Sequence, residues 1–554
     1  MDPTEFEACR RNRALQALPC TMMDRPLRVT DVMRRAEQLF PTREIVTRTA
    51  PGVISRRTYA DVALEARRLA TVLAERGVQP GQRVATLMWN HDRHLAAYYA
   101  VPALDAVLHP INPRLSAQEI AYIIADAGDV ALLIDEDLLP LWREVHGLVA
   151  VPLVIVHGDG MAARTAGLPR WQDLVRDDVV PRAWPSTPVD ETAPVSVCYT
   201  SGTTGRPKGV VYSHRSILLH GLAASLPDAF GISGRDTLMP LTPMFHVNGW
   251  SMPYTAVLLG AKLVLTGARP SSRDILDLLD SERVTATFGV PTVWTDVLAA
   301  VDAAPTRWRL QPGLRIYAGG SAPPPEMFRR FDALGVWLQT GWGMTECSPI
   351  GTQTWLRPEY DGADAAQRLQ IRCSNGLPLP FIEIRHVGDA GDALPWDGKA
   401  LGELQVRGPW VTSAYVGIAG PLPAVSDDGW LKTGDIVRIS PDGYLWLVDR
   451  LKDLVKSGGE WISSIDMENA LCEHPDVLEA AVIAVPDPHW SERPLALVAP
   501  RAGASLTGQQ LREHLLNQFP KWMVPEHIEI VPALPRTSVG KINKLALRQR
   551  YTGT

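Results

Sequence analysis

Short apolar strands that end in glycine-bearing loops recur along this chain, and helix-like segments separate them. The strand-like AKLVLTG precedes the helix-like SSRDILDLLDSERV and then TATFGVP, and LRIYAGG precedes PPPEMFRRFDALGV and then WLQTGWG. Nearer the N-terminus, TYADVALEARRLATVLAERGV leads into RVATLMW in the same way. This alternation predicts an α/β fold. In open parallel sheets ligands lie beyond the carboxyl ends of the strands, so the glycine-bearing loops are the expected binding region.

The whole chain of 554 residues is too long for a single hydrophobic core. The sequence pattern changes twice in its second half. After about Leu377, short alternating strands such as GELQVRGPW and GYLWLVDR predict a β-rich subdomain. At DRLKDLVKSGG the character shifts again, and Ser463 or Ser464 is expected to cap the next helix. We therefore expect a large N-terminal domain over residues 1–448, a hinge linker over 449–454 and a small α+β C-terminal domain over 455–554.

Composition excludes several classes of protein. The net charge of -6 leaves no basic excess, so we expect no nucleic-acid partner. The six cysteines are scattered without zinc-type spacing, and the N-terminus lacks the apolar core of a signal peptide, which favours a reducing cytoplasm. The most apolar stretch, residues 254–266, contains Lys262 and is shorter than the ~20 residues that span a bilayer, so we expect no transmembrane segment.

The segment YTSGTTGRPKGV, residues 199–210, indicates a polyphosphate-binding loop between two strand-like runs. It is not a Walker A loop, because Lys208 is followed by glycine and is separated from the preceding glycine by Arg206 and Pro207. An ordinary glycine-rich surface turn is the simpler alternative. The glycines permit close backbone approach and the hydroxyls donate hydrogen bonds. The loop residues in question are Thr200, Ser201, Gly202, Thr203, Thr204, Gly205 and Lys208.

Further segments follow the loop in a fixed order. They are MFHVNGW, YAGGSAPP, TGWGMTE, LKTGD, DRLKDLVKSGGEWIS and PRTSVGKINK. Together the series resembles the adenylate-forming superfamily from about Thr21 to the end of the chain, and SGGEWISS with MFHVNGW is most similar to bacterial medium- and long-chain fatty acyl-CoA synthetases. The resemblance implies that a carboxylate attacks the α-phosphate of ATP and expels pyrophosphate. The thiol of CoA then attacks the acyl-adenylate.

Several roles follow from the resemblance for the phosphate groups. Lys208 and the loop hydroxyls would hold the β- and γ-phosphates, and Thr200 with Glu346 would bind Mg²⁺, a hard ion that prefers oxygen ligands. Lys541 would bridge the carboxylate and the α-phosphate as a compact positive charge. The alternative for Lys541 is a solvated surface lysine among Arg536, Lys544 and Arg548.

The resemblance also assigns the nucleoside. Asp435 would accept the ribose hydroxyls, although an aspartate in TGD can instead stabilise a turn. Trp342 stands where the family usually has tyrosine, and its indole offers the same stacking face to adenine. Thr345 would bond the α-phosphate. The remaining residues expected near the nucleotide are Val247, Gly320, Ser321, Thr340 and Gly341.

Two residues of MFHVNGW are expected at the acyl substrate. Trp250 would gate the acyl tunnel, and His246 would lie beside the substrate carboxylate. Each has a structural alternative, because most of the 17 tryptophans must be core residues and a lone histidine is more often a neutral core group.

The family rotates its C-terminal domain between the two half-reactions, so the C-terminal domain is expected to be mobile. Lys452 would be the hinge residue, with Arg450 near the ribose and phosphate. Lys456, Gly458, Gly459 and Trp461 would then reach the site, with the glycines and Trp461 lining the pantetheine tunnel. An ordinary interdomain linker is the alternative.

The leading hypothesis is thus an Mg²⁺-dependent fatty acid–CoA ligase that uses ATP and CoA, in the cytoplasm and as a homodimer by analogy. One rival is a CoA ligase for a short functionalised acid such as 3-methylmercaptopropionate. Another is a fatty acyl-AMP ligase that loads a carrier protein. A catalytically silent nucleotide-binding protein is disfavoured because Lys541, Asp435 and Glu346 are all present.

Overall fold

A computed structural model describes residues 22–187, 189–200, 206–388, 390–417, 424–457, 460–501, 503–537 and 541–552. The predicted loop residues 201–205 and the predicted tunnel residues Gly458 and Gly459 lie outside this described part. Within it, no helix combines the length and the apolar character needed to cross a membrane.

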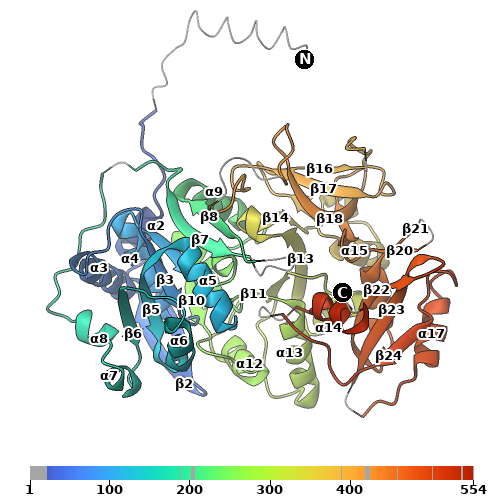
Figure 1. Ribbon diagram of the computed structural model, residues 1–554, viewed down its shortest axis with the longest axis horizontal. Helices are drawn as coiled ribbons and strands as arrows, with labels where there is room; N and C mark the ends of the chain where they lie inside the picture. The colour runs from blue at the N-terminus through green and yellow to red at the C-terminus, as the bar shows by residue number, and fades with distance from the viewer. Residues whose placement is uncertain are drawn as a thin grey trace, which may run out of the picture.

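The N-terminal part is built on two sheets (Figure 1). The first has nine strands in the order β15-β14-β13-β12-β11-β9-β10-β1-β2, parallel from β1 to β13 and antiparallel at both edges. Its strands are β1 (Glu44–Ala50), β2 (Val53–Thr58), β9 (Thr237–Pro240), β10 (Lys262–Leu265), β11 (Ala286–Gly289), β12 (Arg315–Ala318), β13 (Trp337–Gly343), β14 (Ile350–Gln353) and β15 (Leu377–Pro378).

The second sheet has six strands in the order β6-β5-β3-β4-β7-β8. All pairs are parallel except β7 with β8. The strands are β3 (Arg83–Leu87), β4 (Val107–Pro110), β5 (Asp129–Asp135), β6 (Leu153–His157), β7 (Pro194–Tyr199) and β8 (Gly209–Ser213). The expected α/β fold with parallel sheets is confirmed.

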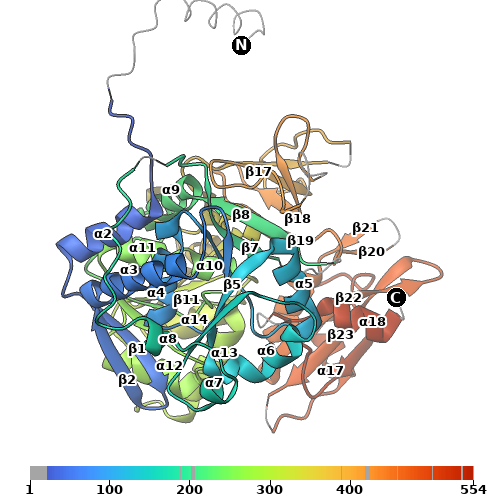
Figure 2. The same cartoon turned by 60° about the vertical axis from the view of Figure 1, so that its left-hand side comes forward.

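Helices cover both faces of each sheet, because successive strand residues point to opposite sides. On β5, for example, Leu133 joins the central core whereas Leu132 joins an outer core. The central helices are α2 (Val29–Leu39), α3 (Tyr59–Glu75), α4 (Asp92–Ala100), α9 (His214–Ser225) and α11 (Met252–Leu259). Helices α5 (Ala117–Ala127) and α6 (Leu139–His146) cover the outer face of the six-stranded sheet, and α12 (Ser272–Ser281), α13 (Pro291–Ala303) and α14 (Pro325–Ala333) cover that of the nine-stranded sheet. Figure 2 shows this layering from the N-terminal side.

Local sequence explains where several helices begin. Helix α3 starts after Thr58, whose hydroxyl accepts from the backbone N–H of Asp61 while the Asp61 carboxylate accepts from the backbone of Thr58. This reciprocal capping box satisfies two N–H groups that the helix leaves unpaired. Helix α16 (Ser464–Cys472) is capped by Ser463, one of the two serines expected in that role.

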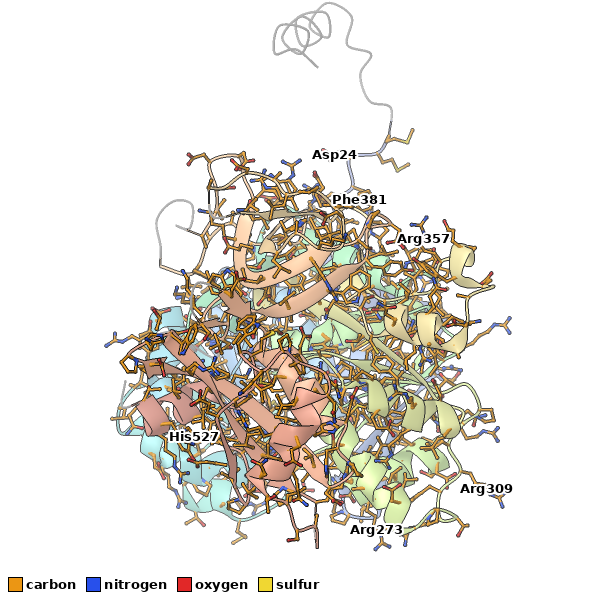
Figure 3. The ribbon with its side chains drawn as sticks, turned by 90° about the vertical axis from the view of Figure 1, so that its right-hand side faces the viewer. Asp24, Arg273, Arg309, Arg357, Phe381 and His527 are labelled. Carbon is orange, nitrogen blue, oxygen red and sulfur yellow. The ribbon has the colours of Figure 1, made fainter. Side chains whose placement is uncertain are left out.

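The C-terminal half contains two further sheets. The predicted β-rich subdomain is an antiparallel sheet of β16 (Glu383–Val387), β17 (Gly402–Arg407), β18 (Leu431–Ile439) and β19 (Leu445–Arg450). The last sheet comprises β20 (Val455–Ser457), β21 (Glu460–Ile462), β22 (Val477–Asp487), β23 (Ser491–Pro500) and β24 (His527–Ile530). Helices α16, α17 (Gly508–Leu516) and α18 (Lys544–Thr552) belong to this α+β unit. Figure 3 faces it, with the labelled His527 at the start of β24.

One segment departs from ordinary backbone geometry. Short helix α10 (Val247–Trp250) and Ser251 have five consecutive positive φ angles, of 40°, 41°, 64°, 54° and 58°. Of these residues only Gly249 lacks a Cβ, and L-residues pay about 1–2 kcal/mol each for the left-handed region. The surrounding packing must therefore impose this turn, and no local sequence signal predicted it.

Candidate active site

The glycine-rich loop closes where strands β7 and β8 meet. The backbone N–H of Thr200 donates to the carbonyl of Lys208 at 2.9 Å, and the N–H of Lys208 donates to Thr200 Oγ1 at 3.3 Å. The Lys208 side chain is exposed. The base of the predicted phosphate loop is thus a closed turn that carries an exposed lysine side chain.

Lys208, predicted for the phosphates, and Glu346, predicted for Mg²⁺, both contact Tyr415. The phenol of Tyr415 donates to Glu346 Oε1 at 2.6 Å, and Lys208 Nζ lies 5.2 Å from the centre of the Tyr415 ring. Sequence reasoning missed Tyr415, because it stands far from both partners in a loop after β17 that carries no recognised signal. The structure therefore adds an aromatic residue between the predicted phosphate-binding lysine and the predicted Mg²⁺ ligand.

The predicted ribose acceptor lies in a buried polar cluster. Asp435 is 1% exposed, and its Oδ2 accepts the indole N–H of Trp342 at 2.7 Å. Arg450 Nε lies 2.8 Å from Asp435 Oδ1. The structure thus brings three residues predicted for the nucleotide together from strands β13, β18 and β19.

Lys541 reaches this cluster from the C-terminal unit. A Cβ added to Gly320 would lie 3.0 Å from Lys541 Cε and 3.5 Å from its Nζ. Gly320 itself has a φ of +89°, a backbone conformation that residues with a side chain rarely adopt, and the end of the Lys541 side chain lies against it. Lys541 is therefore part of the slot between the two units and is not the solvated surface lysine of the alternative prediction.

The neighbouring cations behave differently from Lys541. Arg536 pairs with Glu479 at 2.8 Å, Lys544 pairs with Glu468 at 2.6 Å, and Arg548 pairs with Asp453. Among the residues that the structure describes, Lys541 has no carboxylate within ion-pair distance. Burial, assisted by the charge of Arg450 and partly offset by Asp435, lowers the pKa of Lys541 to about 8.

The other residues predicted around the nucleotide are close-packed. Thr340 is 2% exposed, and a Cβ on Gly341 would come within 2.4 Å of the Thr352 carbonyl. Thr345 is 9% exposed, and its carbonyl accepts from the phenol of Tyr212 at 2.8 Å. Ser321 is exposed.

His246 lines a pocket at the carboxyl ends of strands β4 and β7. The lining residues are Pro110, Ile111, Asn112, Leu115, Ile123, Tyr199, Thr200, Phe245 and His246. Burial, together with the charges of Lys541 and Arg114, lowers the pKa of His246 to about 3. The imidazole is therefore neutral at physiological pH and suits a hydrogen-bonding role better than a charge-pairing one. The mostly apolar wall is chemically suited to the first carbons of an acid.

Trp250 lies in the left-handed segment and packs on the nucleotide side of the site. It is 8% exposed, and a Cβ on Gly319 would come within 2.7 Å of its Cη2. Val247, three residues earlier, is also buried. Trp250 is thus core-packed in this structure and also adjoins the Gly319–Gly320 turn, so both sequence hypotheses for it remain predictions.

The predicted hinge begins beside the Asp435 cluster, whereas the predicted tunnel residue Trp461 lies on a hairpin outside it. Arg450 ends strand β19, and the carbonyl of Arg450 accepts from the N–H groups of Asp453 and Leu454 at 2.8 and 2.9 Å. Lys452 lies between Arg450 and Asp453 in the sequence and is exposed. On hairpin β20–β21, Lys456 Nζ lies 5.1 Å from the centre of the Trp461 ring, and both side chains face solvent. The structure brings Arg450 to the nucleotide cluster but not Lys456 or Trp461.

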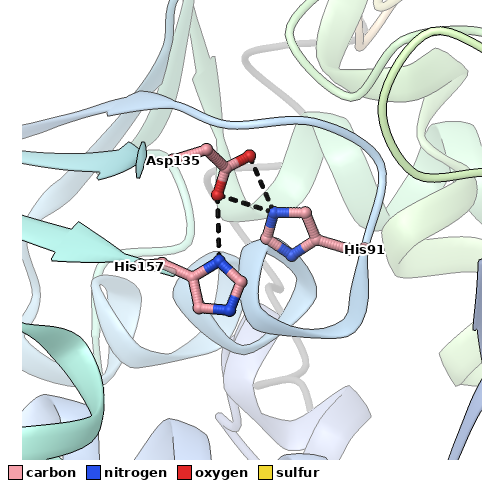
Figure 4. A group of neighbouring side chains, drawn as sticks. All are labelled: His91, Asp135 and His157. Carbon is pink, nitrogen blue, oxygen red and sulfur yellow. Dashed lines mark hydrogen bonds and ion pairs between the residues drawn. The ribbon is translucent and has the colours of Figure 1, made fainter. Parts of the chain in front are cut away.

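A separate polar group, not expected from the sequence, joins three adjacent strand ends (Figure 4). Asp135 accepts from His91 Nε2 at 3.0 Å, from His157 Nδ1 at 3.0 Å and from the backbone N–H of Trp89 at 2.8 Å. The side-chain atoms lie within 4.8 Å of one another, a spacing compatible with a metal ion. However, His91 Nδ1 accepts from the N–H of His94, so its proton must reside on Nε2, where a metal would bind. The geometry favours a hydrogen-bonded clamp.

Comparison with known proteins agrees with this geometry. Residues 33–416 match the model of the AMP-binding enzyme family, and residues 466–541 match the AMP-binding enzyme C-terminal domain. The chain is 45% identical to a long-chain-fatty-acid–CoA ligase of Thermus thermophilus over 97% of this chain and 98% of the relative. It is 39% identical to a medium-chain-fatty-acid–CoA ligase of Ectopseudomonas oleovorans over 96% and 97%. It is also 39% identical to a 3-methylmercaptopropionyl-CoA ligase of Ruegeria pomeroyi over 96% and 98%.

Solved structures share the whole architecture. The ATP-bound MatB of Rhodopseudomonas palustris superposes with a TM-score of 0.79 at 25% identity, covering 94% of this chain and 99% of that one. A fatty acyl CoA synthetase of Mycobacterium tuberculosis gives 0.70 at 26% identity, covering 95% and 98%. The sequence resemblance is confirmed, and the protein belongs to the AMP-binding enzyme family.

Proposed function

We propose that the protein is a fatty acid–CoA ligase. In its reaction ATP activates a medium- to long-chain carboxylic acid to acyl-AMP with release of pyrophosphate, and CoA then takes the acyl group as a thioester. The observation that carries the proposal is the position of Lys541, a partly buried cation without an acidic partner among the described residues, against Gly320 and beside the Asp435 cluster.

Mg²⁺ fits the oxygen donors of Thr200 and Glu346. Glu346 is 7% exposed, and the structure gives its Oε2 no partner among the described residues, so one carboxylate oxygen is available to a cation. Bound there, the ion would neutralise charge on the phosphates of ATP. Lys208 and the loop residues 201–205 would hold the same phosphates.

The chain's own groups account for the first half-reaction. Negative charge grows on the phosphates as pyrophosphate leaves, so a preorganised cation accelerates this step, with each such group worth a few kcal/mol. Lys541 would bridge the carboxylate and the α-phosphate, and the N–H of neutral His246 would hold the carboxylate in place. Asp435 would accept the ribose hydroxyls, while Thr345, Trp342, Val247, Gly320, Ser321, Thr340 and Gly341 would complete the nucleotide site.

The second half-reaction needs a different arrangement of the C-terminal unit. With Lys541 in the slot, the side chains of Lys456 and Trp461 on hairpin β20–β21 are exposed. A rotation about Lys452, between a domain of residues 1–448 and one of residues 455–554, would withdraw Lys541 and bring Lys456, Gly458, Gly459 and Trp461 to the acyl-adenylate. Trp250 would gate the acyl tunnel.

The substrate assignment rests on the relatives. The 45% and 39% identities to long- and medium-chain ligases favour a medium- to long-chain fatty acid. A 3-methylmercaptopropionyl-CoA ligase is equally similar at 39%, so a short functionalised acid is the second candidate. We also propose a cytoplasmic location and a homodimer.

A substrate panel tests the proposal. Acids from C3 to C18, each with and without CoA, are assayed for pyrophosphate and AMP release. A maximum at medium or long chains, with thioester formed only when CoA is added, supports the ligase. A maximum at C3–C4 or with a thioether acid selects the second candidate, and ADP with phosphate as products would refute both.

A further inference from the structure

Residues 412–416 cross between the phosphate loop and the turn that carries Glu346. The backbone N–H of Thr412 donates to the Glu346 carbonyl at 2.8 Å, and the N–H of Val416 donates to the Gly209 carbonyl at 2.8 Å. Two backbone bonds therefore fix this strap at both ends. Its one aromatic residue, Tyr415, lies between the two anchored ends and touches a side chain on each side.

The hydroxyl of Tyr415 determines the orientation of the Glu346 carboxylate. A carboxylate can only accept, so the phenol is the donor in the 2.6 Å bond to Oε1. Such charge-assisted bonds are short and strong compared with neutral ones. Because Oε1 is engaged, Oε2 is the oxygen presented to a cation.

The ring of Tyr415 contacts the ammonium of Lys208. The ammonium lies 5.2 Å from the ring centre, within the range of a cation–π contact. An exposed lysine otherwise samples many rotamers, and each must be given up when a phosphate binds. A ring that already holds the ammonium near the loop reduces this loss.

We propose that Tyr415 is a positioning residue that presents Glu346 Oε2 to the Mg²⁺ of Mg·ATP and holds Lys208 toward the same polyphosphate. The inference rests on the proposed function for the identity of the ligand. It is a role for this chain's own residue that acts through two groups, and Tyr415 itself need not touch the nucleotide.

Tyr415→Phe tests the hydroxyl. Binding of α,β-methylene-ATP is measured by calorimetry without acid or CoA, once with Mg²⁺ and once with EDTA. We expect binding with Mg²⁺ to weaken about tenfold, the effect of losing one hydrogen bond to a charged group, and binding with EDTA to stay unchanged. A purely structural role would weaken both equally, and that result, or no change with Mg²⁺, would overturn the proposal.

Tyr551→Phe is the matched control. Tyr551 donates to Glu529 at 2.7 Å in the C-terminal unit, so the variant removes the same kind of bond away from the site. It should leave both affinities unchanged. If the wild-type protein fails to bind the analogue with Mg²⁺, the proposed function is wrong. If the wild type and Tyr415→Phe bind it equally well, only the role of Tyr415 is wrong.

Tyr415→Leu tests the ring. This variant removes the contact with Lys208 as well, so binding with EDTA should now weaken, because the cation is no longer held near the loop. Equal affinities of Tyr415→Leu and Tyr415→Phe with EDTA would contradict the role assigned to the ring. Thermal unfolding of each variant separates loss of fold from loss of binding.

Discussion

Trp342 shows how a single side-chain exchange can add a contact to the site. Its indole N–H donates to Asp435 at 2.7 Å, and the same ring packs over Gly351, where an added Cβ would come within 2.6 Å. Trp342→Phe should therefore leave a buried carboxylate oxygen short of a donor. We expect the KM for ATP to rise about tenfold, because a hydrogen bond to a charged group is lost, with the KM for the acid unchanged. An unaltered KM for ATP would show that Asp435 does not depend on this bond.

Lys541 gives the site a pH dependence whose sign can be stated. Its pKa in the free enzyme is lowered to about 8, chiefly by burial, and only the protonated form can bridge two anions. The kcat/KM for adenylation should therefore fall as the pH rises through about 8, since this parameter reports groups of the free enzyme. Bound anions favour the charged lysine, so kcat should fall only at higher pH. Pyrophosphate release measured across pH 6.5–10 gives the pH dependence of both kcat/KM and kcat. A kcat/KM that stays constant up to pH 10 would exclude Lys541 as the cation needed for adenylation.

The same lysine separates the two half-reactions. Lys541→Ala removes the cation from the Gly320 slot and should abolish pyrophosphate release from ATP and acid. Thioester formation from supplied acyl-AMP and CoA should persist, because that step follows departure of pyrophosphate. The two rates are measured on the same preparation, and equal loss of both would refute the division of labour.

At the scale of elements, Asp135 fastens the carboxyl ends of β3, β5 and β6 (Figure 4). Although burial alone would raise the pKa of Asp135, the electrostatic attraction of the N–H groups of His91 and His157, and the hydrogen bonds that they donate, hold this pKa below its ordinary value. The loop after β3 also carries Asn90, whose Nδ2 donates to the Thr242 carbonyl at 2.9 Å and whose Oδ1 accepts from Met244 at 2.8 Å. The clamp thus supports the segment that holds His246.

Asp135→Asn should destabilise this part of the fold. The amide cannot accept all three N–H groups, and an unsatisfied buried donor costs about 1–3 kcal/mol in the free energy of unfolding. Urea unfolding at neutral pH measures the loss. Asp177→Asn serves as the control. The Asp177 side chain pairs with Arg68 but is itself fully exposed, so its loss should cost little. The contribution of Asp135 is present above its unfolded pKa and is lost as the pH falls toward its lowered folded pKa, so the two proteins should converge in acid.

Elements with local signals were predictable, and those fixed by distant contacts were not. The strand pair around the glycine loop, helix α3 with its Thr58 cap and helix α16 with its Ser463 cap follow from periodicity and capping. The left-handed turn of α10 has no such signal, since three of its four residues carry a Cβ. The Asp135 clamp and Tyr415 escaped notice for the same reason. His91 and Asp135 are 44 residues apart and meet through the sheet order, whereas Tyr415 and Glu346 are 69 residues apart and meet through the backbone bonds of residues 412–416.

At the scale of the molecule, one lysine of the C-terminal unit completes a slot built by the N-terminal sheets. Lys541 lies against Gly320, whereas Trp461 of the same unit faces solvent. If Trp461 is to reach the same slot, as the proposed second half-reaction requires, the C-terminal unit must move relative to the N-terminal sheets. The sequence motifs name candidate site residues one by one, and only the folded chain shows which of them lie together in one conformation.

Three buried histidines join the central helices to their neighbours and should make the whole N-terminal part acid-labile. His94 bonds Thr86 and Trp89, His214 accepts from Val29, and His220 accepts from Ile350. Burial lowers their pKa values to about 3, 4 and 3, with smaller contributions from His91 for His94 and from Arg28 for His214. Below pH 6.5 these histidines bind protons in the unfolded chain but stay neutral in the folded state, so the free energy of unfolding falls as the pH falls.

Each of these histidines should contribute about 1.4 kcal/mol per pH unit below 6.5, or about 6 kcal/mol for the three together at pH 5. Buried Glu65 and Asp129, whose pKa values are raised by burial, act in the opposite direction, so the test compares variants and not pH values alone. His220→Gln retains an acceptor for Ile350 but cannot titrate. The unfolding free energy of this variant, measured in urea, should depend less steeply on pH between 6.5 and 5, because unfolding takes up about one proton fewer. The control is His527→Gln, at an exposed position, which should keep the wild-type slope. Equal slopes for all three proteins would show that His220 takes up its proton without unfolding.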